Sequence, residues 1–284
     1  METKKINNTS NLSSDLDIKN KLFKHVQLQS NEELGHYLAG LIDGDDHISR
    51  ISIIIAFNYL DLSLAHYLVA KIGHGNIYSI KNKNAIKLVI SNFDGIKTIL
   101  DLINGKLRSE NKLNQINRLL NNSKFTHKFD NSIDFKLNLS KDLNNHWLSG
   151  FSDADASFQI KIIEKKHRKK PEVRLSFQIS QKTVFLLELI KSYLGGNIGH
   201  RVNHDTFYYS STNFKSANNV INYFDKFNLL SSKYLNYLKW KKAYLLIQDR
   251  QHLEISGIEK ILTLKKSMNS YSKETLDLFI DKDK

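Results

Sequence analysis

The chain has 284 residues and no cysteine, which excludes disulfide frameworks and cysteine-ligated zinc sites. Its 42 Lys and Arg residues against 29 Asp and Glu residues give a formal net charge of +13, which favours a polyanionic partner without separating DNA from RNA or a membrane surface. No apolar run approaches the length of a membrane-spanning helix, and the length allows two domains of ordinary size.

Residues 1–30 are rich in Asn, Ser and Lys and nearly lack apolar periodicity. We therefore expect them to form a disordered tail. They contain acidic residues and no arginine, so they do not resemble a mitochondrial transit peptide.

The first expected element is a helix that ends in two aspartates. Residues 37–46 read Tyr-Leu-Ala-Gly-Leu-Ile-Asp-Gly-Asp-Asp. Apolar side chains recur here at helical spacing: Leu34, Leu38, Leu41 and Ile42. Gly40 and Gly44 lie on one face of this helix. Glycine inside a helix costs about 1 kcal/mol relative to alanine, and close approach of a second helix backbone would explain its presence.

The first half continues with a strand at 51–57, a helix at 60–72, strands at 77–81 and 85–91, and closing helices. We expect a first domain at 31–121 and a linker at 122–145. The second domain, 146–284, repeats the pattern with strands at 158–163 and 172–180, a helix at 182–194, and strands at 198–203 and 206–211. The prediction is an α+β protein of tandem αββαββα repeats with two antiparallel sheets.

The second domain opens with a copy of the first motif. Residues 147–156 read Trp-Leu-Ser-Gly-Phe-Ser-Asp-Ala-Asp-Ala, with Gly150 and Ala154 in the places of Gly40 and Gly44. Extra residues lengthen the first hairpin of this half. Its connector, 164–171, is strongly basic; it is either a solvated charged loop or a phosphate-contacting hairpin.

The carboxylates of the two motifs, Asp43, Asp45, Asp153 and Asp155, should lie at helix C-termini, where the helix dipole disfavours negative charge. Packing of the two helices would also bring Asp45 near Asp155, and such a pair repels unless a cation neutralises it. Oxygen ligands of this kind suit Mg²⁺. The alternative is that these aspartates are solvated turn residues.

Both motifs resemble the signature of the LAGLIDADG homing endonucleases, in the single-chain form with two motifs. The first departs from the signature at Gly44, which replaces alanine, and at Asp46, which replaces the closing glycine. The second copy is looser, with differences at Ser149, Phe151, Ser152 and Ala156. The resemblance covers roughly residues 30–270. The segment Lys71-Ile-Gly-His-Gly-Asn-Ile-Tyr78 and the composition rich in Asn, Lys and Ile are similar to those of fungal mitochondrial, intron-encoded members.

The resemblance implies a set of site residues. The second aspartate of each motif, Asp45 or Asp155, would ligate the metal together with the preceding carbonyl group, that of Gly44 or Ala154. A lysine from each half would lie near the active site. Lys233 is the candidate in the second half and Lys112 in the first, where Lys106 and Arg108 compete with it.

Alternating strands supply the candidate DNA contacts. Along 172–180, apolar side chains alternate with Arg, Ser and Gln, the side-chain types that contact bases and phosphates. An ordinary half-exposed sheet would look similar. The candidate DNA-binding residues are Arg50, Ser79, Lys81, Lys87, Gln159, Lys161, Lys165, Lys166, Arg168, Arg174, Ser176, Gln178 and Arg201.

The resemblance implies a monomeric, mitochondrial endonuclease whose two sheets form a saddle on double-stranded DNA. It would make a staggered double-strand break in a long asymmetric target with Mg²⁺, with Mn²⁺ able to substitute and Ca²⁺ supporting binding without cutting. One alternative is an RNA maturase that assists splicing of its host group I intron. A DNA-binding regulator on the same fold is more distant, because no space for a helix-turn-helix module is apparent.

Overall fold

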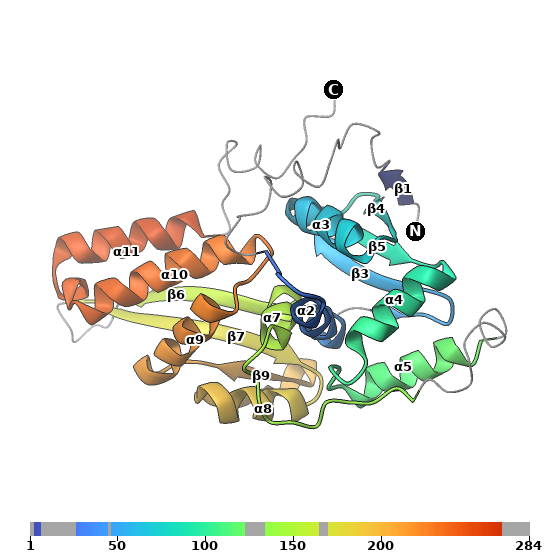
Figure 1. Ribbon diagram of the computed structural model, residues 1–284. Coiled ribbons are helices and arrows are strands. Elements are labelled where there is room, and N and C mark those ends of the chain that lie inside the picture. The colour runs from blue at the N-terminus through green and yellow to red at the C-terminus, as the bar shows by residue number, and fades with distance from the viewer. Residues whose placement is uncertain (1–2, 7–26, 45–46, 123–133, 165–169, 269–284) are drawn as a thin grey trace. The chain divides into compact units, whose positions relative to one another are not determined.

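The computed structural model describes residues 3–6, 27–44, 47–122, 134–164 and 170–268 (Figure 1). These residues divide into two compact units, the first ending at Ala154 and the second beginning at Asp155. Each unit contains one antiparallel sheet with helices. The predicted α+β class with two antiparallel sheets is therefore confirmed.

The first unit begins with a short strand and the first motif helix and ends with the second motif helix. In chain order its elements are β1 (Thr3–Ile6), α2 (Asn31–Gly44), β2 (His47–Ile48), β3 (Ile53–Asn58), α3 (Leu62–Ile72), β4 (Asn76–Ile80), β5 (Ala85–Ile90), α4 (Phe93–Ile103), α5 (Glu110–Leu120) and α7 (Trp147–Asp155), whose last residue opens the second unit.

The sheet of the first unit has the strand order β1-β4-β5-β3-β2, with every neighbouring pair antiparallel. Side chains alternate between a buried and a more exposed face, as the period of two predicts. The buried face carries Ile53, Ile55, Phe57, Ile77, Ile86, Leu88 and Ile90. Helix α3 packs on β3, β4 and β5, and α4 packs on α2 and α3.

The second unit repeats this topology. Its elements are β6 (Ala156–Ile163), β7 (Glu172–Gln181), α8 (Phe185–Leu194), β8 (Asn197–Arg201), β9 (Thr206–Ser210), α9 (Phe214–Lys226), α10 (Lys233–Gln248) and α11 (Ile255–Ser267). The strand order β6-β7-β9-β8 corresponds to β2-β3-β5-β4 of the first unit. The two sheets therefore have the same connectivity, as expected of a duplication.

An aromatic cluster forms the core of the second unit. The ring of Phe158 on β6 lies 5.1 to 5.8 Å, centroid to centroid, from the rings of Phe177, Phe224, Tyr237 and Trp240. These partners come from β7, α9 and α10. The cluster fixes which face of the β6–β7 hairpin is buried.

The first hairpins differ in length between the units, as the sequence predicts. Strands β6 and β7 have 8 and 10 residues, whereas β2 and β3 have 2 and 6.

The N-terminal region differs from the expected disordered tail. Residues Thr3–Ile6 form β1, which pairs with β4 at the edge of the sheet. Leu28 is also buried, and its amide donates a hydrogen bond to the hydroxyl oxygen of Tyr67 at 3.0 Å. Composition alone misses both features because the stabilising partners are distant in sequence.

Candidate metal centre and DNA-binding sheets

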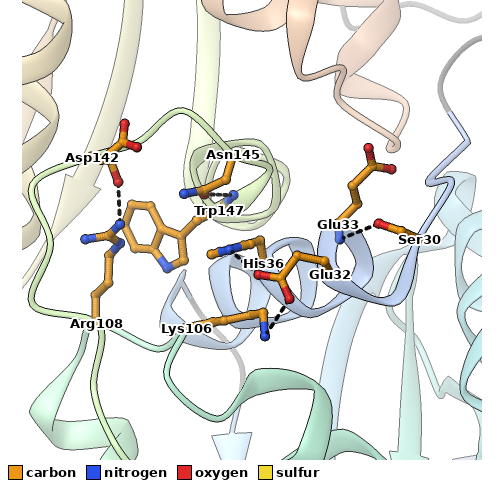
Figure 2. Close-up of polar contacts among 9 residues, drawn as sticks. All are labelled: Ser30, Glu32, Glu33, His36, Lys106, Arg108, Asp142, Asn145 and Trp147. Atoms are coloured by element: carbon orange, nitrogen blue, oxygen red, sulfur yellow. Dashed lines mark hydrogen bonds and ion pairs between the residues drawn. The ribbon is translucent and has the colours of Figure 1, made fainter.

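Side-chain caps fix where the two motif helices begin. The Ser30 hydroxyl accepts a hydrogen bond from the Glu33 amide at 3.2 Å, and the Asn145 side chain accepts one from the Trp147 amide at 2.9 Å (Figure 2). Such caps satisfy amides that a helix N-terminus otherwise leaves without an intrahelical partner. They set the start of α2 and α7, and hence the positions of the motif residues.

The backbones of α2 and α7 touch at one glycine on each helix. A Cβ atom built on Gly40 would lie 1.9 Å from the carbonyl oxygen of Trp147, and one built on Gly150 would lie 2.0 Å from that of Tyr37. No side chain fits in either place. The predicted close approach of these helices at their small residues is therefore confirmed.

Helices α2 and α7 also touch at their C-terminal ends, through the same faces that carry Gly40 and Gly150. A Cβ built on Gly44 would lie 2.4 Å from the Cβ of Ala154. These are the two residues whose carbonyl groups the family resemblance assigns to the metal. The residues that follow them in the chain are the second aspartates of the motifs, Asp45 and Asp155.

The first aspartates of the motifs are engaged across the helix pair. The indole Nε1 of Trp147 donates to Asp43 Oδ2 at 2.8 Å, and the hydroxyl of Tyr37 donates to Asp153 Oδ2 at 2.8 Å. Each aromatic residue opens one motif, and its acceptor is the first aspartate of the other motif. Both carboxylates are buried, so their role is structural. This reciprocal pairing is not predicted by the sequence analysis.

Asp43 also holds the start of α5. Its carboxylate accepts hydrogen bonds from the backbone amides of Arg108, at 2.7 Å, and Ser109, at 3.1 Å, and Ser109 is the residue that precedes α5. Burial raises the pKa of the Asp43 carboxyl to about 6, although the donated hydrogen bonds and the Lys112 ammonium oppose this shift. Asp43 thereby connects the first motif to the helix that carries Lys112.

Arg108 has a structural role beside the second motif helix. Its guanidinium donates to the carbonyl oxygen of Asp142 and lies 5.1 Å from the centre of the Trp147 ring (Figure 2). It also donates to the carbonyl oxygen of Ser140. The segment before α7 is thus tied to the start of α5. Arg108 is 3% exposed, so the guanidinium is occupied in holding this segment.

Lys106, the other competitor of Lys112, pairs with the first turn of α2. Its Nζ lies 3.2 Å from a carboxylate oxygen of Glu32, whose other oxygen lies 3.1 Å from Nε2 of His36 (Figure 2). Burial is the main cause that lowers the pKa of His36. Lys106 therefore also has an identified structural partner.

The two lysine candidates lie at the starts of equivalent helices. Lys112 is in the first turn of α5 and is buried. Lys233 is the first residue of α10 and is half-buried, and its amide donates to the Ser231 hydroxyl at 3.2 Å.

Asp155 is the last residue of α7 and is half-buried, and its carboxylate accepts a hydrogen bond from the side-chain amide of Gln181. Asp45 lies outside the described residues. Among the residues that the structure does describe, no group of three His, Asp or Glu side chains could hold a metal ion. The remaining candidate donors, carboxylate and carbonyl oxygens at helix ends, are chemically suited to a hard divalent cation.

The sheet of the second unit presents a polar, basic face on the side opposite the aromatic cluster. Ser157, Gln159 and Lys161 alternate along β6 with the buried Phe158 and Ile160. The register places Lys161 directly opposite Arg174. Like charges in opposed positions destabilise a sheet, so this arrangement favours an anionic partner.

The candidates on β7 and β8 differ in exposure. Arg174 is exposed and pairs with Glu172, with Nε 2.5 Å from Oε1. Ser176 lies on the same face, opposite Gln159, but it is buried there and bonds the Ser210 hydroxyl at 2.7 Å. Gln178 is half-buried, and Arg201 is exposed and donates to the Ser180 hydroxyl at 3.0 Å.

The first unit carries fewer candidates on the equivalent face. Lys87 on β5 lies on the outward face, with its Nζ 5.8 Å from the ring centre of Tyr78. Ser79 instead shares the face of the buried Ile77, two residues earlier, and its hydroxyl donates to the carbonyl oxygen of Lys4 at 3.3 Å. Arg50 and Lys81 are exposed in connections outside the strands.

Three further candidates, Lys165, Lys166 and Arg168, lie outside the described residues. None of the helices in the described ranges combines the length and the hydropathy that a membrane span requires.

A protein-family model described as LAGLIDADG endonuclease matches residues 148–244, which include the second motif from Leu148 onward. The uncharacterized cox1 intron-2 37.2 kDa protein of Schizosaccharomyces pombe is 54% identical over 240 residues, covering 84% of this chain and 73% of that protein. The chain belongs to the LAGLIDADG endonuclease family. The resemblance inferred from the two motifs is therefore confirmed.

Further relatives of this LAGLIDADG chain are intron-encoded. The intron-encoded DNA endonuclease aI3 of Saccharomyces cerevisiae is 29% identical, covering 87% of this chain and 72% of that protein. The intron-encoded RNA maturase bI4 of the same species is 26% identical, covering 77% of this chain but only 33% of that protein.

The fold of this chain also matches that of a solved protein. The structure of I-SmaMI bound to an uncleaved DNA target in the presence of calcium ions aligns with a TM-score of 0.67 at 22% identity, covering 86% of this chain and all of that one. At this identity the likeness establishes the fold, in which a single chain supplies both halves.

Proposed function

We propose that this LAGLIDADG chain is a site-specific homing endonuclease that makes a staggered double-strand break in a long, asymmetric DNA target. The observation that carries the proposal is the α2–α7 pair, whose backbones touch at Gly40 and Gly150 and whose last turns meet at Gly44 and Ala154. Buried structural aspartates accompany this contact, while a second aspartate follows in each motif. The relationship to the DNA endonuclease aI3 supports the same activity.

Mg²⁺ is the proposed cofactor, with Mn²⁺ as a substitute and Ca²⁺ supporting binding alone. Asp45 and Asp155, with the carbonyl groups of Gly44 and Ala154, would hold it, because these are the oxygen donors that Mg²⁺ prefers. A bound divalent ion would activate water and polarise the phosphodiester group. The solved I-SmaMI complex with uncleaved DNA and calcium is consistent with the proposed role of Ca²⁺.

Lys112 and Lys233 are the proposed catalytic lysines, whose positive charge would stabilise the charge that develops on the phosphate. Lys112 is preferred over its competitors because Lys106 pairs with Glu32 and Arg108 holds two carbonyl oxygens. Asp43 supports this role by fixing the amides at the start of α5.

The outward faces of the two sheets are the proposed DNA-contacting surfaces, because a β-ribbon can enter the major groove of duplex DNA. Lys161, Arg174 and Arg201 on one sheet and Lys87 on the other supply positive charge on exposed or half-buried positions. Ser176 and Ser79 are not retained as contacts, since one is buried and the other lies on the opposite face.

A selection for cleaved sites tests the activity and finds the target together. Libraries of randomised and intron-junction duplexes are incubated with the protein in Mg²⁺ and, separately, in Ca²⁺. We expect specific cleavage in Mg²⁺ and binding without cleavage in Ca²⁺. Binding without cleavage in every metal would contradict the endonuclease proposal.

Substitution of the second aspartates tests the site. Asp45→Asn and Asp155→Asn should each abolish double-strand cleavage while changing DNA affinity by less than about tenfold, which is about 1.4 kcal/mol. Asp101→Asn is the matched control, because Asp101 is an exposed carboxylate on α4 that pairs, among the residues the structure describes, with Lys97 on its own helix. A large loss of DNA binding in either motif variant would assign that aspartate a structural role instead.

The relationship to the RNA maturase bI4 favours a second candidate function, in which the chain assists splicing of its host group I intron. Splicing of precursor RNA by the purified chain tests it. Splicing that survives Asp45→Asn would separate this role from cleavage, whereas no effect of the wild-type chain on splicing would contradict it.

We also propose that the chain acts as a monomer in mitochondria. One chain carries both motif helices, and a relative is the product of a cox1 intron. Light scattering of the complex with the selected target tests the first part. A mass corresponding to two chains per duplex would contradict it.

A further inference from the structure

Strand β1 breaks the correspondence between the two sheets. It pairs with β4 at the edge of the first sheet (Figure 1), whereas β8, the equivalent of β4, is an edge strand of the second sheet. The first sheet thus gains a strand on the side away from its short β2–β3 hairpin. This addition enlarges the surface that the first unit can present.

The register of β1 determines which of its side chains reach the outward face. Lys5 lies opposite Tyr78, and Ile6 lies opposite the buried Ile77. Side chains directly opposite one another in a sheet lie on the same face. Lys5 therefore lies on the outward face, while the neighbouring Lys4, opposite Ser79, lies on the other face.

Lys5 extends a row that crosses the sheet on its outward face. Tyr78 is paired with Lys87, and Lys87 is paired with Ala56. Two lysines thus flank one tyrosine across three adjacent strands. Because neighbouring strands are about 4.8 Å apart, the Cα atoms of Lys5 and Lys87 are separated by about 10 Å.

The charge of this face is of one sign. Its lysines are Lys5 and Lys87, and none of the five strands of the first sheet contains an Asp or Glu residue. A solvent-exposed face that merely keeps a protein soluble usually mixes both signs. A face whose charged residues are all lysines favours a polyanionic surface as its partner.

We propose that β1 is an added arm of the DNA-binding surface, in which Lys5 contacts a backbone phosphate of the duplex. This inference rests on the proposed function and extends it, because it assigns DNA contact to an N-terminal segment outside the repeated fold. A lysine so placed supplies a point charge that positions the duplex rather than reading bases. The occupant is the phosphate backbone of double-stranded DNA.

The adjacent lysines provide a matched pair of variants. Lys5→Ala and Lys4→Ala each remove one charge from an exposed position on the same strand, but from opposite faces. Lys87→Ala is the positive control, since it lies on the outward face. The far-UV circular dichroism of each full-length variant should equal that of the wild type.

The salt dependence of binding to a random-sequence duplex is the readout, so that the target need not be known. Each phosphate contact adds about 0.9 to the slope of log K against log salt between about 50 and 200 mM. We expect Lys5→Ala and Lys87→Ala each to lower the slope by about 0.9, and Lys4→Ala to leave it unchanged.

Two results would overturn the inference while leaving the proposed function intact. One is a lower slope for Lys87→Ala with an unchanged slope for Lys5→Ala, which would show that β1 does not contact the DNA. The other is an equal decrease of the slope for Lys4→Ala and Lys5→Ala, which would show that binding depends on the total charge and not on the face that carries it. A wild-type chain without salt-dependent duplex binding would instead overturn the proposed function.

Discussion

Asp43 is a buried carboxylate whose ionisation is coupled to stability. Its ordinary pKa of 3.8 rises to about 6 through burial. Because the folded pKa lies above the unfolded one, the contribution to stability is complete below about pH 4 and is lost as the pH rises through 6. A pKa shift of about two units between the unfolded and the folded state corresponds to up to about 3 kcal/mol in the free energy of unfolding. Asp43→Asn removes this dependence.

We therefore expect the free energy of unfolding of the wild type, relative to Asp43→Asn, to fall between pH 4 and pH 7. Denaturant unfolding at both pH values measures the difference. The fluorescence of Trp147, whose indole donates to Asp43, gives a direct check in a Trp240→Phe background. Its titration should have a midpoint near 6 and should vanish in Asp43→Asn. A difference between the two proteins that is independent of pH would contradict the prediction.

Arg174 should contribute to DNA affinity and is restrained in the free protein by Glu172. Arg174→Ala should weaken binding of the selected target about 5- to 150-fold if the guanidinium reads a guanine. Glu172→Gln should tighten binding, because Glu172 is the one acidic residue in the four strands of that sheet. The anisotropy of labelled target DNA, titrated with each variant in Ca²⁺, measures both changes in affinity. Unchanged affinity and unchanged base preference in Arg174→Ala would show that this strand does not contact the DNA.

At the scale of elements, the α2–α7 contact requires glycine. A Gly→Ala change in a helix ordinarily stabilises it by about 1 kcal/mol. Gly40→Ala and Gly150→Ala should instead destabilise the chain by about 1–3 kcal/mol or more, because the new methyl group would overlap a carbonyl oxygen of the facing helix. Thermal unfolding measures the change. Asn114→Ala, at an exposed position of α5, is the control for helix propensity alone.

The elements themselves were largely predictable, because periodicity records which face of each one is buried. The strands from β3 to β9 overlap the ranges predicted for them, β6 alternates as predicted between buried and more exposed side chains, and the glycine spacing on α2 predicted the close contact with α7. Strand β1 was not predicted, because Thr-Lys-Lys-Ile contains no apolar alternation and depends on pairing with β4.

The candidate site was predictable only where the motif repeats. The hydrogen bond from Trp147 to Asp43 joins residues 104 positions apart, and no local pattern encodes it. The same holds for Arg108, whose basic side chain suggested catalysis but holds the carbonyl oxygens of Ser140 and Asp142. The aromatic residue that opens each motif was a usable signal, since both copies carry one.

At the scale of the molecule, the unequal hairpins predict unequal coverage of the target. Lys161 and Arg174 lie directly opposite each other on β6 and β7, so an Asn-Gly turn can replace residues 162–173. Hydroxyl-radical footprinting of this variant should show lost protection at one end of the target only. The replacement leaves the residues of the aromatic cluster around Phe158 unchanged. Loss of protection at both ends would show that the hairpin has no side-specific contact.

The reciprocal hydrogen bonds between the motif helices determine how halves of related proteins can be recombined. A chimera joined within residues 122–145 would take Tyr37 and Asp43 from one parent and Trp147 and Asp153 from the other, so that each bond would join residues of different ancestry. A joint after Ala154, where the second unit begins, keeps both bonds within one parent. Hybrids joined after Ala154 should inherit α2 and α7 from one parent, as a pair already matched in shape and hydrogen bonding. The part taken from the other parent would then be the second sheet with its own helices.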